Sequence, residues 1–103
     1  MSEIVKSVDP KNEVLKTYPG ELDRNYGTLV LSNTRLLFVK EEGFLKKSYT
    51  IMLNHFYKEV KNVVRKGQYI EFTDMKDKVI VFKSEDSAPI VEKSLRDLIK
   101  TSQ

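Results

Sequence analysis

The side chains that could carry chemistry are few, and their types argue against most catalytic sites. The 103 residues contain one histidine, His55, and no cysteine. A zinc centre needs three or four nitrogen, sulfur or carboxylate ligands, so we expect no transition-metal cluster. A serine–histidine–acid triad would depend on His55 alone. We therefore expect His55 to be a histidine in a turn or a partly buried one.

The acidic pairs and the glycines offer no catalytic arrangement either. Glu41-Glu42 and Glu85-Asp86 fall in predicted turns, where solvation or stabilisation of a helix N-terminus explains adjacent carboxylates. The four glycines form neither a P-loop nor a G-x-G-x-x-G motif. We predict that the chain is not an enzyme and needs no cofactor and no small-molecule substrate.

Basic side chains are the remaining candidates, and they gather in the middle of the sequence. Residues 40–66 carry seven basic and three acidic side chains, whereas the whole chain has a net charge of +3. An anionic partner would be attracted mainly to this segment, although solvated loop charges without a partner explain it equally well. The residues that we expect to bind an anion or a lipid are Lys40, Phe44, Lys46, Lys47 and Lys66.

Aromatic residues interleave with these lysines, an arrangement that could suit single-stranded nucleic acid. They are Tyr49, Phe56, Tyr57 and Tyr69. Sheets normally use aromatic side chains in their core or wall, and no basic stripe extends beyond the middle segment. Weak binding of single-stranded nucleic acid is therefore only an alternative, and nucleic acid is not the expected partner.

The elements that must position these residues are mostly strands within one domain, residues 1–103. The length and the 40% hydrophobic content predict a single core. Runs of strand length, rich in β-branched and apolar residues, alternate with turn residues. The expected strands between residues 13 and 83 are 13–17, 26–31, 35–39, 44–53, 68–73 and 79–83, with a seventh inside 54–66. In 44–53 we expect Leu45, Ile51 and Leu53 to point inward.

Turn residues set the limits of these strands. Tyr18-Pro19-Gly20 is expected to end the first strand, with a polar loop over 21–25. Ser32-Asn33-Thr34-Arg35 has the chemistry of a tight hairpin turn, and Asn33 is the best candidate for a left-handed position. The sequence therefore predicts an antiparallel hairpin from 26–31 and 35–39.

The segment 54–66 fits two structures. Phe56, Val60, Val63 and Val64 follow helical spacing, with Asn54 and Gly67 as possible caps. The valine-rich run 60–65 and the following Lys66-Gly67 favour instead a strand that enters a hairpin. We favour the strand, preceded by one helical turn over 54–58, and keep the helix as the alternative.

The C-terminal segment predicts a helix over about 87–101. Residues 84–87 offer N-cap side chains, and Pro89 suits the first turn. An apolar stripe at helical spacing follows, made of Ile90, Val91, Leu95, Leu98 and Ile99. The fold class is thus mainly β with one C-terminal α-helix (α+β), and the helix should cover one open end or face of the sheet.

The N-terminal residues contain no long apolar run, and no other run is long enough to span a membrane. We therefore expect a cytoplasmic protein, or the soluble piece of a larger one, that could attach peripherally to a membrane.

The run from Gly27 to Phe38 reads GTLVLSNTRLLF. It resembles the G-x-L-x-L-[ST]-x-x-R-L-x-F/W signature of GRAM domains, bacterial-type pleckstrin-homology (PH) domains and the GLUE domain of the ESCRT machinery. The matching residues are Gly27, Leu29, Leu31, Ser32, Arg35, Leu36 and Phe38. Because the order of elements over 13–99 also agrees, the resemblance implies a PH-like fold, a bent seven-stranded antiparallel barrel capped by the C-terminal helix.

Arg35 enters the second strand of this hairpin. Its stem can cover apolar side chains while its guanidinium bonds turn carbonyls or a carboxylate. We expect this structural role, with ligand contact as the alternative.

The resemblance implies a non-catalytic binding or adaptor module. In PH domains that bind phosphoinositides the loop of the first strand pair is usually basic, whereas here Glu21 and Asp23 accompany Arg24. An anionic site would therefore be weak or moved to the lysines named above. The implied partners are a protein, including ubiquitin or an ESCRT component, or an anionic membrane with Phe44 at the interface. A structural module that self-associates through its strands is the alternative.

Overall fold

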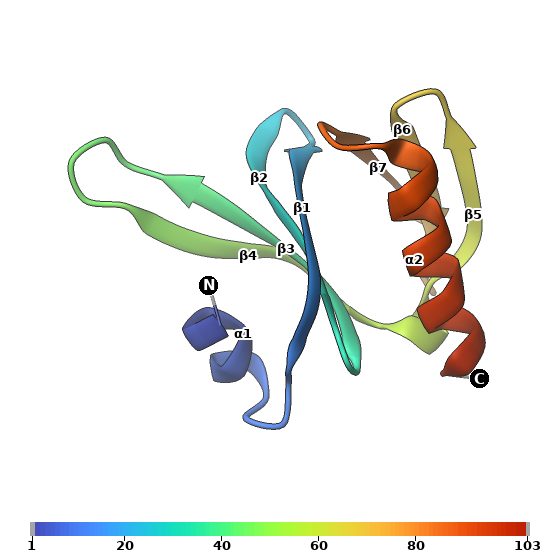
Figure 1. The fold of residues 1–103 in the computed structure, drawn as a ribbon, viewed down its shortest axis with the longest axis horizontal. Helices are drawn as coiled ribbons and strands as arrows, with labels where there is room; N and C mark the ends of the chain where they lie inside the picture. The colour runs from blue at the N-terminus through green and yellow to red at the C-terminus, as the bar shows by residue number, and fades with distance from the viewer. Residues whose placement is uncertain (1, 103) are drawn as a thin grey trace.

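A computed structural model describes residues 2–102, with side chains from Glu3 onward. Seven strands lie between an N-terminal and a C-terminal helix (Figure 1). The elements are α1 (Ser2–Val8), β1 (Val14–Leu22), β2 (Asn25–Ser32), β3 (Arg35–Glu42), β4 (Ser48–Phe56), the 3₁₀ helix η1 (Tyr57–Glu59), β5 (Lys61–Lys66), β6 (Tyr69–Thr73), β7 (Val79–Ser84) and α2 (Ala88–Thr101). The predicted α+β class, with seven strands followed by a C-terminal helix, is confirmed.

The strands form one antiparallel sheet in the order β4-β3-β2-β1-β7-β6-β5. The two halves of the sheet meet where β1 pairs with β7, over Gly20–Leu22 only. A Cβ atom at Gly20 would lie 2.3 Å from the carbonyl oxygen of Lys83, so a glycine is needed for this close approach. No pairing joins β4 to β5 among the described strands, so the sheet is not closed and the predicted barrel is not confirmed.

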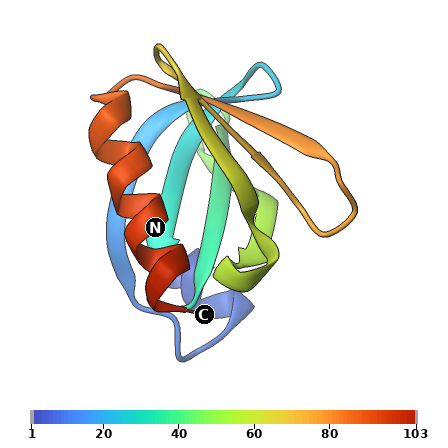
Figure 2. The ribbon, with the colours of Figure 1, turned by 90° about the vertical axis from the view of Figure 1, so that its right-hand side faces the viewer.

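The bent sheet encloses the main hydrophobic core, which α2 covers on one side (Figures 1 and 2). From α2, the side chains of Ala88, Val91 and Leu95 are fully buried. Ile90 is 58% exposed, so its predicted place in the buried stripe is wrong. The remaining core residues are Tyr18, Leu22, Leu29, Leu31, Leu36, Phe38, Leu53, Tyr57, Val60, Val63, Ile70, Phe72, Ile80 and Phe82.

A second, smaller core lies on the opposite face of β2 and β3, under α1. Neither this core nor α1 was predicted from the sequence. Val5 of α1 packs against Val30, Leu37 and Val39, and all four are buried. Successive residues of a strand point to opposite faces. The unbroken apolar runs Leu29–Leu31 and Leu36–Val39 therefore serve both cores at once. Continuous rather than alternating apolar residues are typical of strands covered on both faces.

Strand β1 continues through Tyr18-Pro19-Gly20, so the predicted break at these residues is wrong. The carbonyl of Pro19 accepts a hydrogen bond from the backbone N–H of Glu85 at 3.1 Å, on the side of β7. The N–H and C=O of one strand residue point to the same side. A backbone N–H at residue 19 would therefore point toward β7, so its absence removes no hydrogen bond between β1 and β2. The pairing of β1 with β7 begins at the next residue, Gly20.

The connection between β1 and β2 is a two-residue turn rather than the predicted loop over 21–25. Leu22 pairs with Asn25, and the turn residues Asp23 and Arg24 have φ angles of 48° and 67°. Two successive left-handed residues are typical of a type I′ turn, whose twist matches that of an antiparallel hairpin.

Strand β4 begins at Ser48, four residues later than predicted, and Leu45 is exposed rather than inward. Ile51 pairs with Val39 and packs against the second core under α1, whereas Leu53 pairs with Phe38 in the main core. A β-bulge at Met52 shifts the register between them and switches the alternation of faces. The inward prediction was therefore right only for Leu53.

The segment 54–66 confirms the favoured prediction of a strand. Its helical turn is η1 at Tyr57–Glu59 instead of 54–58, and β5 then enters a turn at Gly67, where φ is 62°.

Candidate functional site

The turn of the signature hairpin between β2 and β3 is held by side-chain hydrogen bonds to the backbone. The hydroxyl of Ser32 accepts hydrogen bonds from the backbone N–H groups of Arg35 at 2.8 Å and Thr34 at 3.2 Å, which closes the turn. Asn33 does not adopt the predicted left-handed conformation. Its side-chain amide instead accepts from the N–H of Glu13 at 2.8 Å and donates to the carbonyl of Lys11 at 3.1 Å. Asn33 therefore holds the start of β1 against the turn.

Asn12 extends this polar network to α1. Its side chain is fully buried. It donates to the carbonyl of Val5 at 3.2 Å and accepts from the hydroxyl of Thr34 at 2.6 Å. Because a buried amide without partners is costly, these bonds fix α1 relative to the hairpin.

Arg35 has the structural role that the sequence predicts. Its guanidinium lies 4.1 Å from the centre of the Phe56 ring, donates to the side-chain oxygen of Asn54 at 3.2 Å and lies 3.8 Å from the carboxylate of Asp9. The partners are thus a ring, an amide and a carboxylate. The side chain is 17% exposed and braces β3 against β4, so it offers little surface to a ligand.

The other signature residues are also accounted for by packing. Leu29, Leu31 and Phe38 lie in the main core. A Cβ atom at Gly27 would lie 2.2 Å from the carbonyl oxygen of Val39. The signature therefore specifies the hairpin, and the candidate binding residues have to be sought elsewhere.

Four of the five predicted binding residues come together on the hairpin of β3 and β4, which projects from the rest of the molecule (Figure 1). Lys40 lies in β3, whereas Phe44, Lys46 and Lys47 lie in the connecting loop. Lys66 lies in β5, the opposite outer strand of the sheet, and does not join them.

The end of this hairpin is apolar and almost fully exposed. Phe44 is 96% exposed and its neighbour Leu45 is 94% exposed. Gly43 precedes them with a φ of 102° that favours glycine. We call residues 43–47 the hairpin tip. Leu45 was not among the predicted binding residues, because a strand with Leu45 inward was expected to begin at residue 44, although the glycine before it and the lysines after it are the signal of a loop.

Glutamates neutralise much of the basic charge around the tip. Lys40 pairs with Glu42 at 2.5 Å, and Lys47 pairs with Glu41 at 2.6 Å. The hydrogen bond to Glu41 raises the pKa of Lys47, which stays charged. Lys46 has no ion-pair partner within the described part of the chain. Lys66 is likewise paired, with Glu71 at 3.2 Å.

His55 is partly buried in β4, as predicted, beside a pocket of about 220 Å³. Asp74 also lines this pocket and is 8% exposed. Hydrogen bonds donated by the backbone of Lys78 and of Lys76 lower the pKa of Asp74. The carboxylate thus holds the β6–β7 turn. Within residues 2–102 no cluster of three or more histidine, aspartate or glutamate side chains could hold a metal ion.

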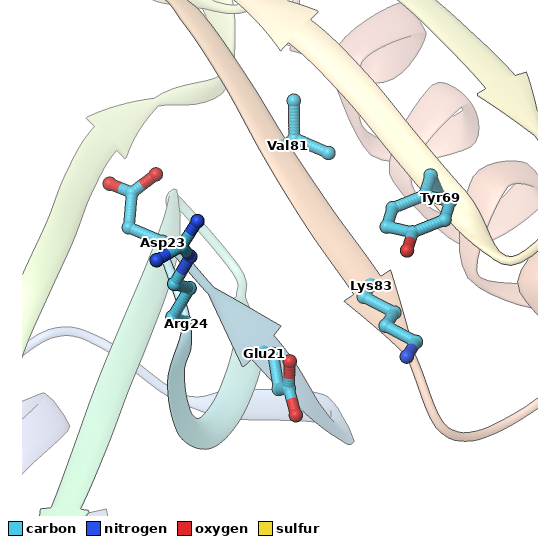
Figure 3. Close-up of a pocket in the computed structure, with 6 residues that line it drawn as sticks. All are labelled: Glu21, Asp23, Arg24, Tyr69, Val81 and Lys83. Atoms are coloured by element: carbon cyan, nitrogen blue, oxygen red, sulfur yellow. The ribbon is translucent and has the colours of Figure 1, made fainter.

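Two of the further hollows border β1 on the outside of the molecule. One, of about 260 Å³, has mixed charges, with Lys83 between Glu21 and Tyr69 and with Asp23 and Arg24 at the turn (Figure 3). The other, of about 400 Å³, lies between β1 and α2 and contains the apolar side chains of Leu15, Ile90 and Leu98. None of the helices within the described residues is long and apolar enough to cross a membrane.

Comparisons with known proteins support the fold alone. No family model matches the sequence, and no curated protein matches it. The chain is similar in structure to the crystal structure of the C-terminal domain of an unknown protein from Leishmania infantum. The TM-score is 0.71 at 13% identity, and the match covers 95% of this chain and 96% of that chain.

Proposed function

We propose that this chain is a non-catalytic, PH-like docking module that attaches to anionic membrane surfaces through the hairpin tip. The observation that carries the proposal is the exposure of Phe44 (96%) and Leu45 (94%) directly before two lysines. Adjacent apolar side chains at the end of a projecting hairpin can enter a bilayer while the rest of the molecule stays in water. Exposed apolar groups of this kind mark interaction sites.

The expected attachment is weak and depends mainly on the apolar side chains. Burying a phenylalanine or leucine side chain gains about 1.5–3 kcal/mol. A lysine near an anionic leaflet adds about fivefold in affinity. Lys46 is available for this contribution, whereas Lys40 and Lys47 already pair with glutamates. Stable recruitment would therefore need a second attachment, as it does for a single lipid chain.

The PH-like part of the proposal is supported by three features. The signature residues Gly27–Phe38 occupy one hairpin, seven antiparallel strands form a bent sheet, and a C-terminal helix covers its core. A fold can host many functions, so the docking role depends on the tip rather than on the fold.

The test is sedimentation with vesicles of phosphatidylcholine, with and without phosphatidylserine. The parent chain should bind the vesicles that contain phosphatidylserine, and the double variant F44S/L45S should bind at least about tenfold more weakly. The matched control is Met75→Ser, which removes a 65% exposed apolar side chain from the β6–β7 turn and should bind like the parent. Equal binding by F44S/L45S and the parent, or no binding by the parent, would contradict the proposal.

Docking of a protein partner is the second candidate. The groove between β1 and α2 favours it, since Leu15 and Ile90 remain about half exposed there. A ubiquitin or ESCRT-type partner would be tested by NMR titration. Saturable shifts of Leu15, Ile90 and Leu98, without shifts at the hairpin tip, would support this candidate.

A further inference from the structure

The two outer strands of the sheet are protected to very different degrees. In β5, three of six residues are cationic, namely Lys61, Arg65 and Lys66. Asn62 has a φ of 57° within a register shift of the β5–β6 ladder. The guanidinium of Arg96 in α2 donates a hydrogen bond to the carbonyl of Val63. Charges, bulges and covered backbone groups are the means by which proteins prevent pairing at a sheet edge.

Strand β4 has few of these protections. Its nine residues, SYTIMLNHF, include no lysine, arginine, aspartate, glutamate, proline or glycine. Within the described strands β4 pairs only with β3, so the backbone groups on its other side are not used in the sheet. A long, uncharged outer strand of this kind is a template for pairing with another chain.

The bulge at Met52 limits how much of β4 can pair. It divides the strand into residues 48–51 and residues 53–56. The second part borders the pocket that also contains Asp74 and Lys78, so neighbouring residues restrict access to it. The first part belongs to the projecting hairpin (Figure 1). Its residues Ser48, Tyr49 and Thr50 are exposed. Residues 48–51 are therefore the accessible part of the edge.

We propose that residues 48–51 of β4 form a strand-pairing surface for a second copy of this chain. Because side chains directly opposite each other in an antiparallel pair lie on the same face, a two-fold symmetric pair must be centred on a residue. A pair centred on Thr50 sets Thr50 opposite Thr50 of the second copy and Tyr49 opposite Ile51. No like charges oppose each other in this register, and an aromatic residue facing a β-branched one is a favourable cross-strand pair. A strand without charge has no means of selecting a charged peptide, whereas it is complementary to itself. The contact is isologous, so it closes as a dimer.

This proposal does not depend on membrane docking. The pairing uses backbone groups of β4, whereas docking uses the side chains of Phe44 and Leu45. Because only a short segment of each copy pairs, the dimer should be weak and should appear only at high protein concentration.

The test combines sedimentation velocity with NMR of the whole chain in lipid-free buffer. The expected result is a dimer whose fraction rises with concentration. The backbone amide signals of residues 48–51 should shift in parallel and exchange with solvent more slowly, while those of residues 61–66 stay unchanged. A monomer up to NMR concentrations, or shifts confined to the groove of Leu15, Ile90 and Leu98, would overturn the proposal.

Two matched substitutions separate edge pairing from a general charge effect. Tyr49 lies on the outer strand β4, is 43% exposed and pairs with Glu41 of β3. Tyr26 lies on the inner strand β2, is 50% exposed and pairs with Glu21 of β1. Y49K should abolish the dimer, whereas Y26K should keep it. F44S/L45S should also keep it, which distinguishes this proposal from the docking role. Loss of the dimer in F44S/L45S but not in Y49K would assign self-association to the tip and contradict the inference.

Discussion

The phenolic hydroxyl of Tyr57 donates a hydrogen bond of 2.5 Å to the backbone carbonyl of Ser32. Tyr57 lies in η1, and Ser32 ends β2 at the turn of the signature hairpin. Both residues are buried, at 1% and 0% exposure. The bond therefore joins two segments that are 25 residues apart in the sequence, inside the main core.

Tyr57→Phe should destabilise the protein by about 1–2 kcal/mol, since it removes one buried hydrogen bond and leaves the ring in place. The measurement is the free energy of unfolding in urea. Tyr49→Phe serves as the control, because Tyr49 is 43% exposed on β4 and should tolerate the change. Equal losses in both variants would show that the bond to Ser32 contributes nothing specific.

The same residue should make stability depend on pH in alkaline solution. Burial raises the pKa of the Tyr57 hydroxyl above its ordinary value of 10.0. The unfolded chain releases this proton near pH 10, whereas the folded chain retains it, so the contribution of Tyr57 is complete below that pH and is lost above it. The stability difference between the parent and Tyr57→Phe should therefore shrink as pH rises above 10. A constant difference across this range would contradict the prediction.

Substitutions at Asn33 should separate its hydrogen bonds from its backbone conformation. Asn33→Ala should cost about 1–2 kcal/mol, because the N–H of Glu13 and the carbonyl of Lys11 lose their side-chain partner. Asn33→Asp keeps the acceptor for Glu13 and should cost less. Asn33→Gly should be no better than alanine, since the residue is not left-handed. Urea unfolding measures the stabilities of the three variants. A glycine variant that is more stable than the parent would contradict the prediction.

Gly27 should tolerate no side chain, for steric reasons. A Cβ atom there would lie 2.2 Å from the carbonyl oxygen of Val39, so Gly27→Ala must separate β2 from β3 and should cost about 1–3 kcal/mol or more. Gly67→Ala is the comparison, because its turn has open space and only its positive φ of 62° opposes a side chain. The free energy of unfolding of Gly67→Ala should be lower than that of the parent by about 1 kcal/mol. Thermal and urea unfolding measure both, and a smaller loss at Gly27 would be the contrary result.

The ion pairs of the β3–β4 hairpin predict that removing one glutamate strengthens binding to anionic vesicles. Glu41→Gln removes the partner of Lys47 and should strengthen binding to phosphatidylserine vesicles about fivefold, with greater salt dependence. Glu71→Gln releases Lys66 in the same way on the opposite outer strand and should leave binding unchanged. Vesicle sedimentation at low and high salt compares the two. Stronger vesicle binding by Glu71→Gln would instead show that Lys66 contributes to membrane binding.

The sequence predicts this fold where apolar periodicity and turn chemistry agree. Ile70 shares a face with Phe72, and Ile80 shares one with Phe82, as the alternation of these runs indicates, and all four lie in the main core. Helix α2 begins after Ser87, the last of the four cap candidates, although the Ser87 side chain makes no capping hydrogen bond. Periodicity fails at β4, because the bulge at Met52 leaves no mark in the sequence yet reverses the faces of Ile51 and Leu53. Turn chemistry fails at Pro19, where the decisive fact is which neighbouring strand a backbone N–H at this position would face.

The candidate site could be predicted in part. Lys40, Phe44, Lys46 and Lys47 are close in the sequence and remain close on one hairpin, whereas Lys66 required knowledge of the strand order. The pairing of lysines with Glu41 and Glu42 depends on side-chain positions along β3. Self-pairing of β4 depends on which strands end at the sheet edges, and tertiary structure alone determines this.

The packing of α1 implies uneven local stability within the same strands. An isolated helix of seven residues is not stable in water, so α1 persists through its contacts with the sheet and its link to Asn12. Its detachment would leave the main core intact and expose Val30, Leu37 and Val39 to water. Such partial opening costs less than complete unfolding. The molecule can therefore reach a nearly native form with an exposed apolar surface that promotes association, and equilibrium denaturation would not reveal this form.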